Sequence, residues 1–226
     1  MTDFESTASA DTEQAGRWRR LARATGIAGL AFPVLTLTPI IMASTAGEPD
    51  FNGDREAVLA FFQATSSSAP DFGIFVTIVG ILTAVWFGIG LAFLLGRAEG
   101  TPAWRSAVAA ASVAMFAVLA LTGPWEAAQH RARELDPDVG LFAFDLGNLA
   151  FANSWVAIGS FLLCCGWVIV STRCLPRWLG WIAVVGGIGM ALSRVWWTSS
   201  IWLAPYLLFW VFVVAVAIWL LRHPEY

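Results

Sequence analysis

The sequence predicts an all-α membrane protein, a bundle of six transmembrane helices. Hydrophobic residues make up 58% of the 226-residue chain, and its mean hydropathy is +0.69. Charged residues account for 13%, about half of the roughly 25% found in soluble domains. Such a chain has too few polar side chains to cover a surface in water, whereas lipid can solvate its apolar surface. The length suits one membrane domain.

Six stretches are apolar over the roughly 20 residues that a helix needs to cross a bilayer. Residues 1–16 are polar and acidic, and we expect them to form a disordered cytoplasmic tail. Residues 17–226 then form a single transmembrane helical domain. The predicted spans are about 22–43, 73–95, 103–124, 147–170, 178–195 and 200–221.

The first span follows a basic and aromatic segment, 17–23 (RWRRLAR), which is typical of an anchor at the membrane interface. A cleavable signal peptide that ends near 44–46 (STA) is the alternative. The apolar run is longer than in an ordinary signal peptide, and Pro33 and Pro39 interrupt it. We therefore expect a retained span with kinks at both prolines.

The connection after the first span is long and acidic, and it contains a short helix. Asp54 is placed to cap this helix, which we expect to continue to about Thr65. Val58, Phe61 and Phe62 fall on one helical face at the i, i+3 and i+4 spacing. This apolar face predicts an extracytoplasmic helix that lies on the membrane or over the bundle.

The second long connection, after the third span, is also expected to be helical. Gly123-Pro124 should kink the third span, with a short helix beyond the kink. Asp136-Pro137 combines a favoured N-cap residue with proline at the first helical position. We expect one unbroken helix from Pro137 to about residue 171, whose first turns stand outside the membrane. The two connections together predict a small helical dome on the outer face.

The distribution of arginine predicts that both termini are cytoplasmic. The chain has no lysine, and nine arginines flank the spans on the side of the N-terminus, against four on the other side. Basic residues accumulate on the cytoplasmic side of membrane proteins, so the side with nine is cytoplasmic. The nine are Arg17, Arg19, Arg20, Arg23, Arg97, Arg105, Arg173, Arg177 and Arg222, and the four are Arg55, Arg131, Arg133 and Arg194.

Small residues recur at every fourth position on three of the spans. In lipid, such faces let two helices approach closely, because van der Waals packing replaces the hydrophobic driving force. We therefore expect all three faces to be helix-packing faces. They are Gly80, Ala84 and Gly88 on the second span, Ala103, Ala107 and Ala111 on the third, and Ala183, Gly187 and Ala191 on the fifth.

Three segments, taken in their order and placement, resemble a known protein family. They are 55–62 (REAVLAFF) before the second span, 145–151 (DLGNLAF) entering the fourth, and 175–181 (LPRWLGW) entering the fifth. The family comprises uncharacterised multi-pass membrane proteins of high-GC Gram-positive bacteria and is described only as a domain of unknown function. The resemblance covers most of residues 20–221. It implies a bacterial plasma-membrane protein, and it supplies no substrate or catalytic residue.

Polar side chains at the outer ends of the third, fourth and fifth spans are the candidate binding residues, because ionisable groups at membrane depth are often functional. Glu126 and His130 are four apart and share a helical face. Asp145 and Asn148 are three apart where the fourth span begins. Arg194 ends the fifth span, and its expected partner is Asp145, Glu126 or an acid on a ligand. With two aromatic walls, the predicted ligand-binding set is Glu126, His130, Asp145, Asn148, Arg194, Trp125 and Trp197.

A structural interpretation of the same residues stays open. The ends of membrane helices are normally polar, so Glu126 and His130 can simply be solvated. Asp145 and Asn148 can satisfy backbone donors at a helix start. The functional interpretation instead predicts that the set faces one outward-open cavity for a small polar or amphipathic solute.

Several classes of function are disfavoured by the sequence. Without lysine the chain cannot form a Schiff base, and a net charge of −3 gives no footprint for nucleic acid. Hydrolase nucleophile motifs and phosphate-binding loops are missing, and Glu126 with His130 is too small a set for a metal. We therefore predict no cofactor, no metal and no catalytic residue. The midplanes of the spans are nearly free of polar side chains, which counts against ion-coupled transport.

The sequence thus predicts a non-enzymatic membrane module that binds a small ligand, a lipid or a partner protein at its outer face. A small-solute transporter is the alternative, and an intramembrane enzyme is a weaker one. The expected partners are the lipid bilayer and a small ligand or a second membrane protein, and a homo-oligomer stays open.

Overall fold

The computed structural model describes residues 2–45, 47–51, 53–65, 70–120, 123–134 and 136–225. These residues form eight α-helices and two short 3-10 helices, and they contain no strand. The 3-10 helices, η1 (Arg194–Trp196) and η2 (Ser200–Trp202), connect α7 to α8. The α-helices are α1 (Thr2–Thr45), α2 (Arg55–Thr65), α3 (Pro70–Glu99), α4 (Trp104–Leu119), α5 (Gly123–His130), α6 (Pro137–Thr172), α7 (Arg177–Ser193) and α8 (Leu203–Arg222).

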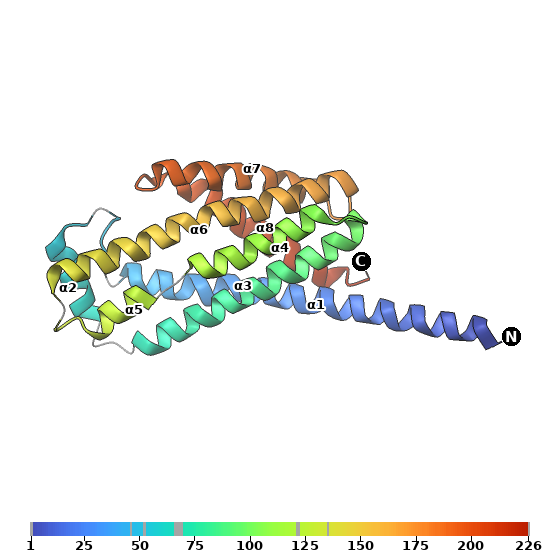
Figure 1. Cartoon of the computed structure of the whole chain (residues 1–226), viewed down its shortest axis with the longest axis horizontal. Coiled ribbons are helices and arrows are strands. Elements are labelled where there is room, and N and C mark those ends of the chain that lie inside the picture. Colours follow the sequence, from blue (N-terminus) through green and yellow to red (C-terminus); the bar gives the residue numbers. More distant parts are fainter. Residues whose placement is uncertain are drawn as a thin grey trace.

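Six helical stretches of the described chain are long and apolar enough to cross a membrane, and the described residues are all-α, as predicted. Each overlaps one predicted span, and the third combines α4 with α5. The long helices run side by side, with both termini toward one end and α2 and α5 at the other (Figure 1). We name these the termini end and the dome end. The six stretches are Thr12–Pro39, Phe72–Glu99, Trp104–His130, Pro137–Thr172, Arg177–Trp196 and Ser200–Arg222.

The six long helices form a closed ring. Helix α1 packs against α3, α3 against α4, α4 against α6, α6 against α7, and α7 against α8. Helix α8 packs in turn against α1, which closes the ring, and α3 also contacts α6. The space inside is filled by apolar side chains, among them Phe87, Phe161, Leu162 and Phe212.

Glycines allow a close approach between α6 and α7. A Cβ added at Gly159 would lie 2.8 Å from the carbonyl oxygen of Gly187, and one at Gly166 would lie 2.7 Å from that of Gly180. Only a residue without a side chain fits at such a distance. The predicted packing face on α7 is thereby confirmed, with Ala183 and Gly187 both buried.

The small-residue prediction is confirmed for α3 and is wrong for α4. Gly80, Ala84 and Gly88 are buried on α3, whereas Ala107 and Ala111 of α4 are exposed. Alanine occurs around much of the circumference of α4, so its spacing alone does not identify the packing face. Contacts with the neighbouring helices determine which face of α4 is buried. The residues that α4 buries are Ser106, Ala109, Ser112 and Val113.

Residues 1–16 were expected to be a disordered tail, but α1 already begins at Thr2. An ion pair one turn apart supports this segment, since Arg17 Nη2 lies 2.6 Å from Glu13 Oε1. Such i, i+4 pairs stabilise isolated helices by a few tenths of a kcal/mol. The N-terminal part of α1 therefore extends past the bundle at the termini end (Figure 1).

Helix α6 confirms the prediction of one unbroken helix from Pro137 across the fourth span. Asp136 caps it, because its Oδ1 accepts the backbone N–H of Asp138 at 2.8 Å. The helix ends at Arg173, which adopts the left-handed conformation with φ of 59°. The predicted kink at Gly123-Pro124 is instead a break between α4 and α5, and residues 121–122 within it lie outside the described chain.

Candidate functional site

An apolar cluster joins α2, α5 and the start of α6 at the dome end. Val58 and Phe62 are fully buried, and Phe61 is buried beside them, as the spacing of these residues predicts. The ring of Trp125 lies 5.3 Å from the rings of both Phe62 and Phe144, between centroids. Helix α2 therefore packs through its apolar face against α5 and α6.

Polar contacts around this cluster fix the position of α2. Asp54 caps the helix as predicted, since its Oδ1 accepts a first-turn backbone N–H at 2.8 Å. Gln129 on α5 donates to the hydroxyl of Thr65 at 3.2 Å, and Arg55 pairs with Asp138 of α6 at 2.9 Å. The Arg55 pair is exposed, so it contributes no more than about 1 kcal/mol. The dome is held mainly by its apolar cluster.

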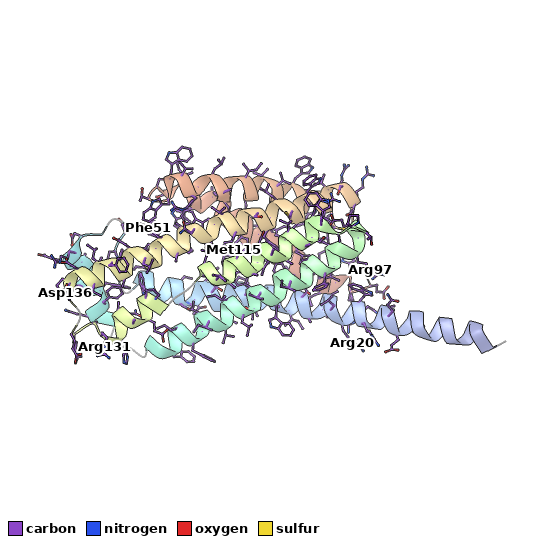
Figure 2. The ribbon with its side chains drawn as sticks, in the orientation of Figure 1. Arg20, Phe51, Arg97, Met115, Arg131 and Asp136 are labelled. Atoms are coloured by element: carbon purple, nitrogen blue, oxygen red, sulfur yellow. The ribbon has the colours of Figure 1, made fainter. Side chains whose placement is uncertain are left out.

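A second group of rings, which we name the aromatic cluster, fills the space between α6 and α8 near the dome end. Phe51, which Figure 2 labels in the connection between α1 and α2, contacts Phe151, Trp197 and Trp202 at centroid distances of 6.5, 5.5 and 6.1 Å. Trp155 stacks on Trp202 at 5.2 Å with an interplanar angle of 26°. The cluster consists of Phe51, Phe151, Trp155, Trp197, Trp202 and Tyr206.

Two buried side-chain donors of α6 lack acceptors, and one of them, Trp155, belongs to the aromatic cluster. Asn148 is 5% exposed and Trp155 is fully buried. Neither Asn148 Nδ2 nor Trp155 Nε1 has a hydrogen-bond partner within the described part of the chain. The two residues are seven apart on α6 and therefore share a helical face. Buried polar groups are nearly always hydrogen-bonded, and an unsatisfied donor costs about 1–3 kcal/mol.

A small apolar cavity lies on the ring axis, further from the dome than Trp155. Its volume is about 30 Å³, which accommodates about one water-sized group. The hydroxyl of Ser112 reaches its wall, but it is already hydrogen-bonded to Ser160 at 2.8 Å. The described lining of this cavity is therefore apolar apart from Ser112. The lining comes from five helices and includes Phe32, Ala84, Phe87, Val113, Phe116, Ile158, Phe161 and Phe209.

Three of the predicted site residues, Glu126, His130 and Asp145, are exposed. No hydrogen bond or ion pair between described residues joins them to one another, to Asn148 or to Arg194. Their exposure fits the structural interpretation, in which water solvates them. A shared cavity for these three residues stays a prediction.

The predicted aromatic walls fall in different clusters. Trp125 packs against Phe62 and Phe144 in the dome, whereas Trp197 packs against Phe51 in the aromatic cluster. Of the predicted residues, Asn148 has the property that a ligand-binding group needs, a buried donor without an acceptor. Trp155 shares this property but is not in the predicted set. Its position seven residues after Asn148 places it on the same helical face, and this spacing is the signal in the sequence that could have identified it.

The expected ion pair of Arg194 with Asp145 or Glu126 is not formed between the described residues, and the third expected partner, an acid on a ligand, stays a prediction. The Nε–H of Arg194 donates to Asn153 Oδ1 on α6 at 2.7 Å, and neither Asp145 nor Glu126 pairs with it in the described chain. The positions of these residues along the helix axis explain why Arg194 meets Asn153 and not Asp145. Asp145 precedes Asn153 by eight residues, about 12 Å along the helix axis. Glu126 belongs to α5, which packs on α2 and α6.

A buried ion pair at the termini end was missed by the sequence analysis. The carboxylate of Glu99, with a side chain 2% exposed, lies 2.8 Å from Arg105 Nε and 2.7 Å from the hydroxyl of Ser106. It also accepts the backbone N–H groups of both residues, at 3.1 and 2.9 Å. Arg105 Nη1 donates to Ser171 of α6 at 3.0 Å. These contacts connect the ends of α3 and α6 to the start of α4.

Arginine and tryptophan also stack at the termini end. The guanidinium carbon of Arg97 (Figure 2) lies 5.0 Å from the ring centroid of Trp18, and that of Arg105 lies 5.4 Å from the ring of Trp167. Stacked pairs of this kind suit a membrane interface, where tryptophan and arginine both keep one side in water.

The described residues contain no group of three or more His, Cys, Asp and Glu side chains placed to hold a metal ion. Among them, Cys164, Cys165 and Cys174 are free thiols. The chain matches no protein-family model, no curated protein and no solved structure. The aromatic cluster and the unpartnered donors of Asn148 and Trp155 are therefore the features that bear on function.

Proposed function

We propose that the protein is a non-enzymatic membrane module that binds one small ligand at its dome end, between α6 and α8 and beneath Phe51. The observation that carries this proposal is the pair of buried donors, Asn148 Nδ2 and Trp155 Nε1, on one face of α6. A ligand with acceptor oxygens satisfies both donors and recovers the desolvation free energy that each loses, about 1–3 kcal/mol.

The aromatic cluster supports a ligand whose remaining body is flat or apolar. Trp155 and Trp202 present stacked rings, and Phe151 and Tyr206 meet Trp202 edge-on. Binding sites for small molecules are lined mainly by such rings, with a few polar groups that fix orientation. The axial cavity is too small for the ligand, so its body lies among the rings and displaces Phe51. The apolar lining of the axial cavity favours binding over ion-coupled transport.

The membrane setting is part of the proposal: a bacterial plasma membrane, cytoplasmic termini and an extracytoplasmic dome. The excess of arginine at the termini end, where Figure 2 places Arg20 and Arg97, supports this orientation. The resemblance of three segments to a family of bacterial membrane proteins supports the compartment. The ligand then enters from outside the cell or from the outer leaflet.

Native mass spectrometry of protein extracted from membranes of the expressing cells tests the proposal. Wild type should retain a bound small molecule, and both Asn148→Leu and Trp155→Phe should lose it. Leucine replaces the amide with an apolar group of similar size, and phenylalanine keeps a ring but removes the N–H. Because Asn148→Leu removes an unsatisfied donor at similar volume, its ligand-free form should melt at or above the temperature of ligand-free wild type. Trp155→Phe also leaves a cavity beside Trp202, so its readout is ligand retention alone.

Trp86→Phe is the matched control, because Trp86 is 65% exposed on α3 and lies outside the aromatic cluster. It should retain the bound molecule as wild type does. Retention by Asn148→Leu and Trp155→Phe at the wild-type level would contradict the proposed function. Destabilisation of Asn148→Leu in the ligand-free state would instead assign its donor a structural role.

A further inference from the structure

We infer that Arg194 and Asn153 bind the phosphodiester group of a membrane lipid, in the leaflet at the dome end. The Nε–H of Arg194 is held by Asn153 Oδ1 at 2.7 Å, which fixes the plane of the guanidinium. Its two terminal amino groups are engaged by no other described residue. They form the planar fork that binds two oxygens of a phosphate at once.

The guanidinium lacks a counter-charge from the protein. No carboxylate among the described side chains lies within ion-pair distance of Arg194, and its partner is a neutral amide. An arginine at membrane depth is normally paired or hydrated, because hydrocarbon does not solvate a charge. The phosphate groups of the lipids themselves are the anions present at high concentration around this part of the protein.

Asn153 lies on the lipid-facing side of α6, outside the ring. Val156, three residues later, is 48% exposed, and Trp167, fourteen residues later, is 54% exposed. Residues spaced by three, seven and fourteen share a helical face, so Asn153 belongs to the same outer face. Phe151 and Trp155 of the aromatic cluster point to the opposite side of the helix. The site of Arg194 is therefore separate from the ligand site proposed beneath Phe51.

The depth of both residues matches the plane of the lipid phosphates. The span Arg177–Trp196 has 20 residues, about 30 Å of helix, which equals the thickness of a hydrocarbon core. Arg177 at one boundary thus places Arg194 near the other. On α6, Asn153 precedes the last helical residue, Thr172, by 19 residues, or about 29 Å. The two residues meet where hydrocarbon gives way to headgroups.

The surroundings of Arg194 favour a lipid over a free anion. Leu192, Val195 and Trp196 are 54, 67 and 56% exposed and flank it with apolar surface. Acyl chains can cover this surface together with Val156, whereas inorganic phosphate covers none of it. A single guanidinium is also a weak site for a hydrated phosphate in water, so the lipid must supply both the anion and the apolar contact.

The test is lipid retention by the full-length protein in a neutral detergent, measured by native mass spectrometry. Phosphatidylglycerol is the probe, and diacylglycerol with the same acyl chains, which lacks phosphate, is its control lipid. Wild type should retain one phosphatidylglycerol and melt at a higher temperature in its presence, and diacylglycerol should do neither. Arg194→Gln should abolish the retention. Asn153→Leu keeps the charge but loses the anchoring amide, and it should weaken retention about tenfold.

Matched variants separate this site from unspecific charge effects and from the proposed function. Arg133→Gln removes an exposed arginine at the same end and should retain the lipid. Trp155→Phe should also retain it, because Trp155 lies on the other face of α6. Equal retention by Arg194→Gln and wild type overturns the inference, as does equal stabilisation by diacylglycerol. Displacement of the lipid by millimolar inorganic phosphate would show a free-anion site and would overturn it too.

Discussion

The carboxylate of Glu99 and the guanidinium of Arg105 form an ion pair across the turn between α3 and α4, with Oε1 and Nε 2.8 Å apart. Helix α4 has no capping side chain of its own, because its N-cap residue is Ala103. Glu99 supplies the missing acceptor from the end of the preceding helix, and it binds two first-turn backbone N–H groups. An anion at a helix N-terminus also interacts favourably with the helix dipole.

Glu99→Ala should destabilise the protein by about 2–3 kcal/mol, because it leaves Arg105 and two backbone N–H groups without their acceptor. Thermal unfolding in detergent, monitored by circular dichroism, measures this loss of stability. Glu13→Ala breaks an exposed pair with Arg17 and should change stability by no more than about 0.5 kcal/mol. The double variant Glu99→Ala, Arg105→Ala should lose less than the two single losses added together, and additive losses would refute the coupling.

The local elements of the fold could be predicted from the sequence because their signals lie close together in the chain. Asp54 with Val58, Phe61 and Phe62 specifies α2, and Asp136-Pro137 specifies the start of α6. Each signal depends on neighbours within one or two helical turns. The six spans could also be predicted, because hydropathy is a property of consecutive residues in the chain.

The partners of long side chains could not be predicted in this way. Arg194 and Asn153 are 41 residues apart, and their contact depends on the rotation and depth of α6 and α7 in the ring. Phe51 lies in a connection without periodicity, so nothing in the sequence places it against Trp197 and Trp202. The capping role of Glu99 could have been predicted from the sequence. Helix α4 starts after alanine, which has no side-chain acceptor, so its first backbone N–H groups need an acceptor from another segment.

Gly187→Ala should destabilise the bundle by about 1–3 kcal/mol, since an added Cβ would lie 2.8 Å from the carbonyl oxygen of Gly159. A backbone atom cannot move aside as a side chain can, so α6 and α7 must separate. Gly73→Ala is the control on α3, where an added Cβ meets no atom within 4 Å. It should be neutral or stabilise the helix by up to about 1 kcal/mol. Equal effects of the two changes on the melting temperature would disprove the close-packing argument.

The proposed orientation predicts which end of the protein a membrane-impermeant thiol reagent reaches in intact cells. Glu134→Cys lies at the dome end, with its side chain 78% exposed, and should be labelled. Glu225→Cys, at the exposed C-terminus, should be labelled only after the cells are broken. Wild type, with Cys164, Cys165 and Cys174, measures the background. Labelling of Glu225→Cys in intact cells would reverse the orientation.

The partly buried carboxyl of Glu48 should make the connection between α1 and α2 sensitive to pH. Burial raises the pKa of its carboxyl above the ordinary value of 4.5. The folded state therefore favours the protonated form. Its contribution to stability is complete below pH 4.5 and is lost as the pH rises through the raised folded-state pKa. Because Glu48 precedes Phe51 by three residues, this loss should loosen Phe51 from Trp197 and Trp202.

Glu48→Gln should remove this pH dependence, because an amide of the same shape stays neutral. The melting temperature of wild type should equal that of the variant at about pH 4 and fall below it as the pH rises to about 7. Hydrogen exchange of the backbone N–H groups near Phe51 should rise over the same range in wild type alone. Glu56→Gln, at an exposed carboxyl on α2, is the control and should follow wild type. Parallel profiles of wild type and Glu48→Gln would show that the carboxyl does not control how Phe51 covers the site.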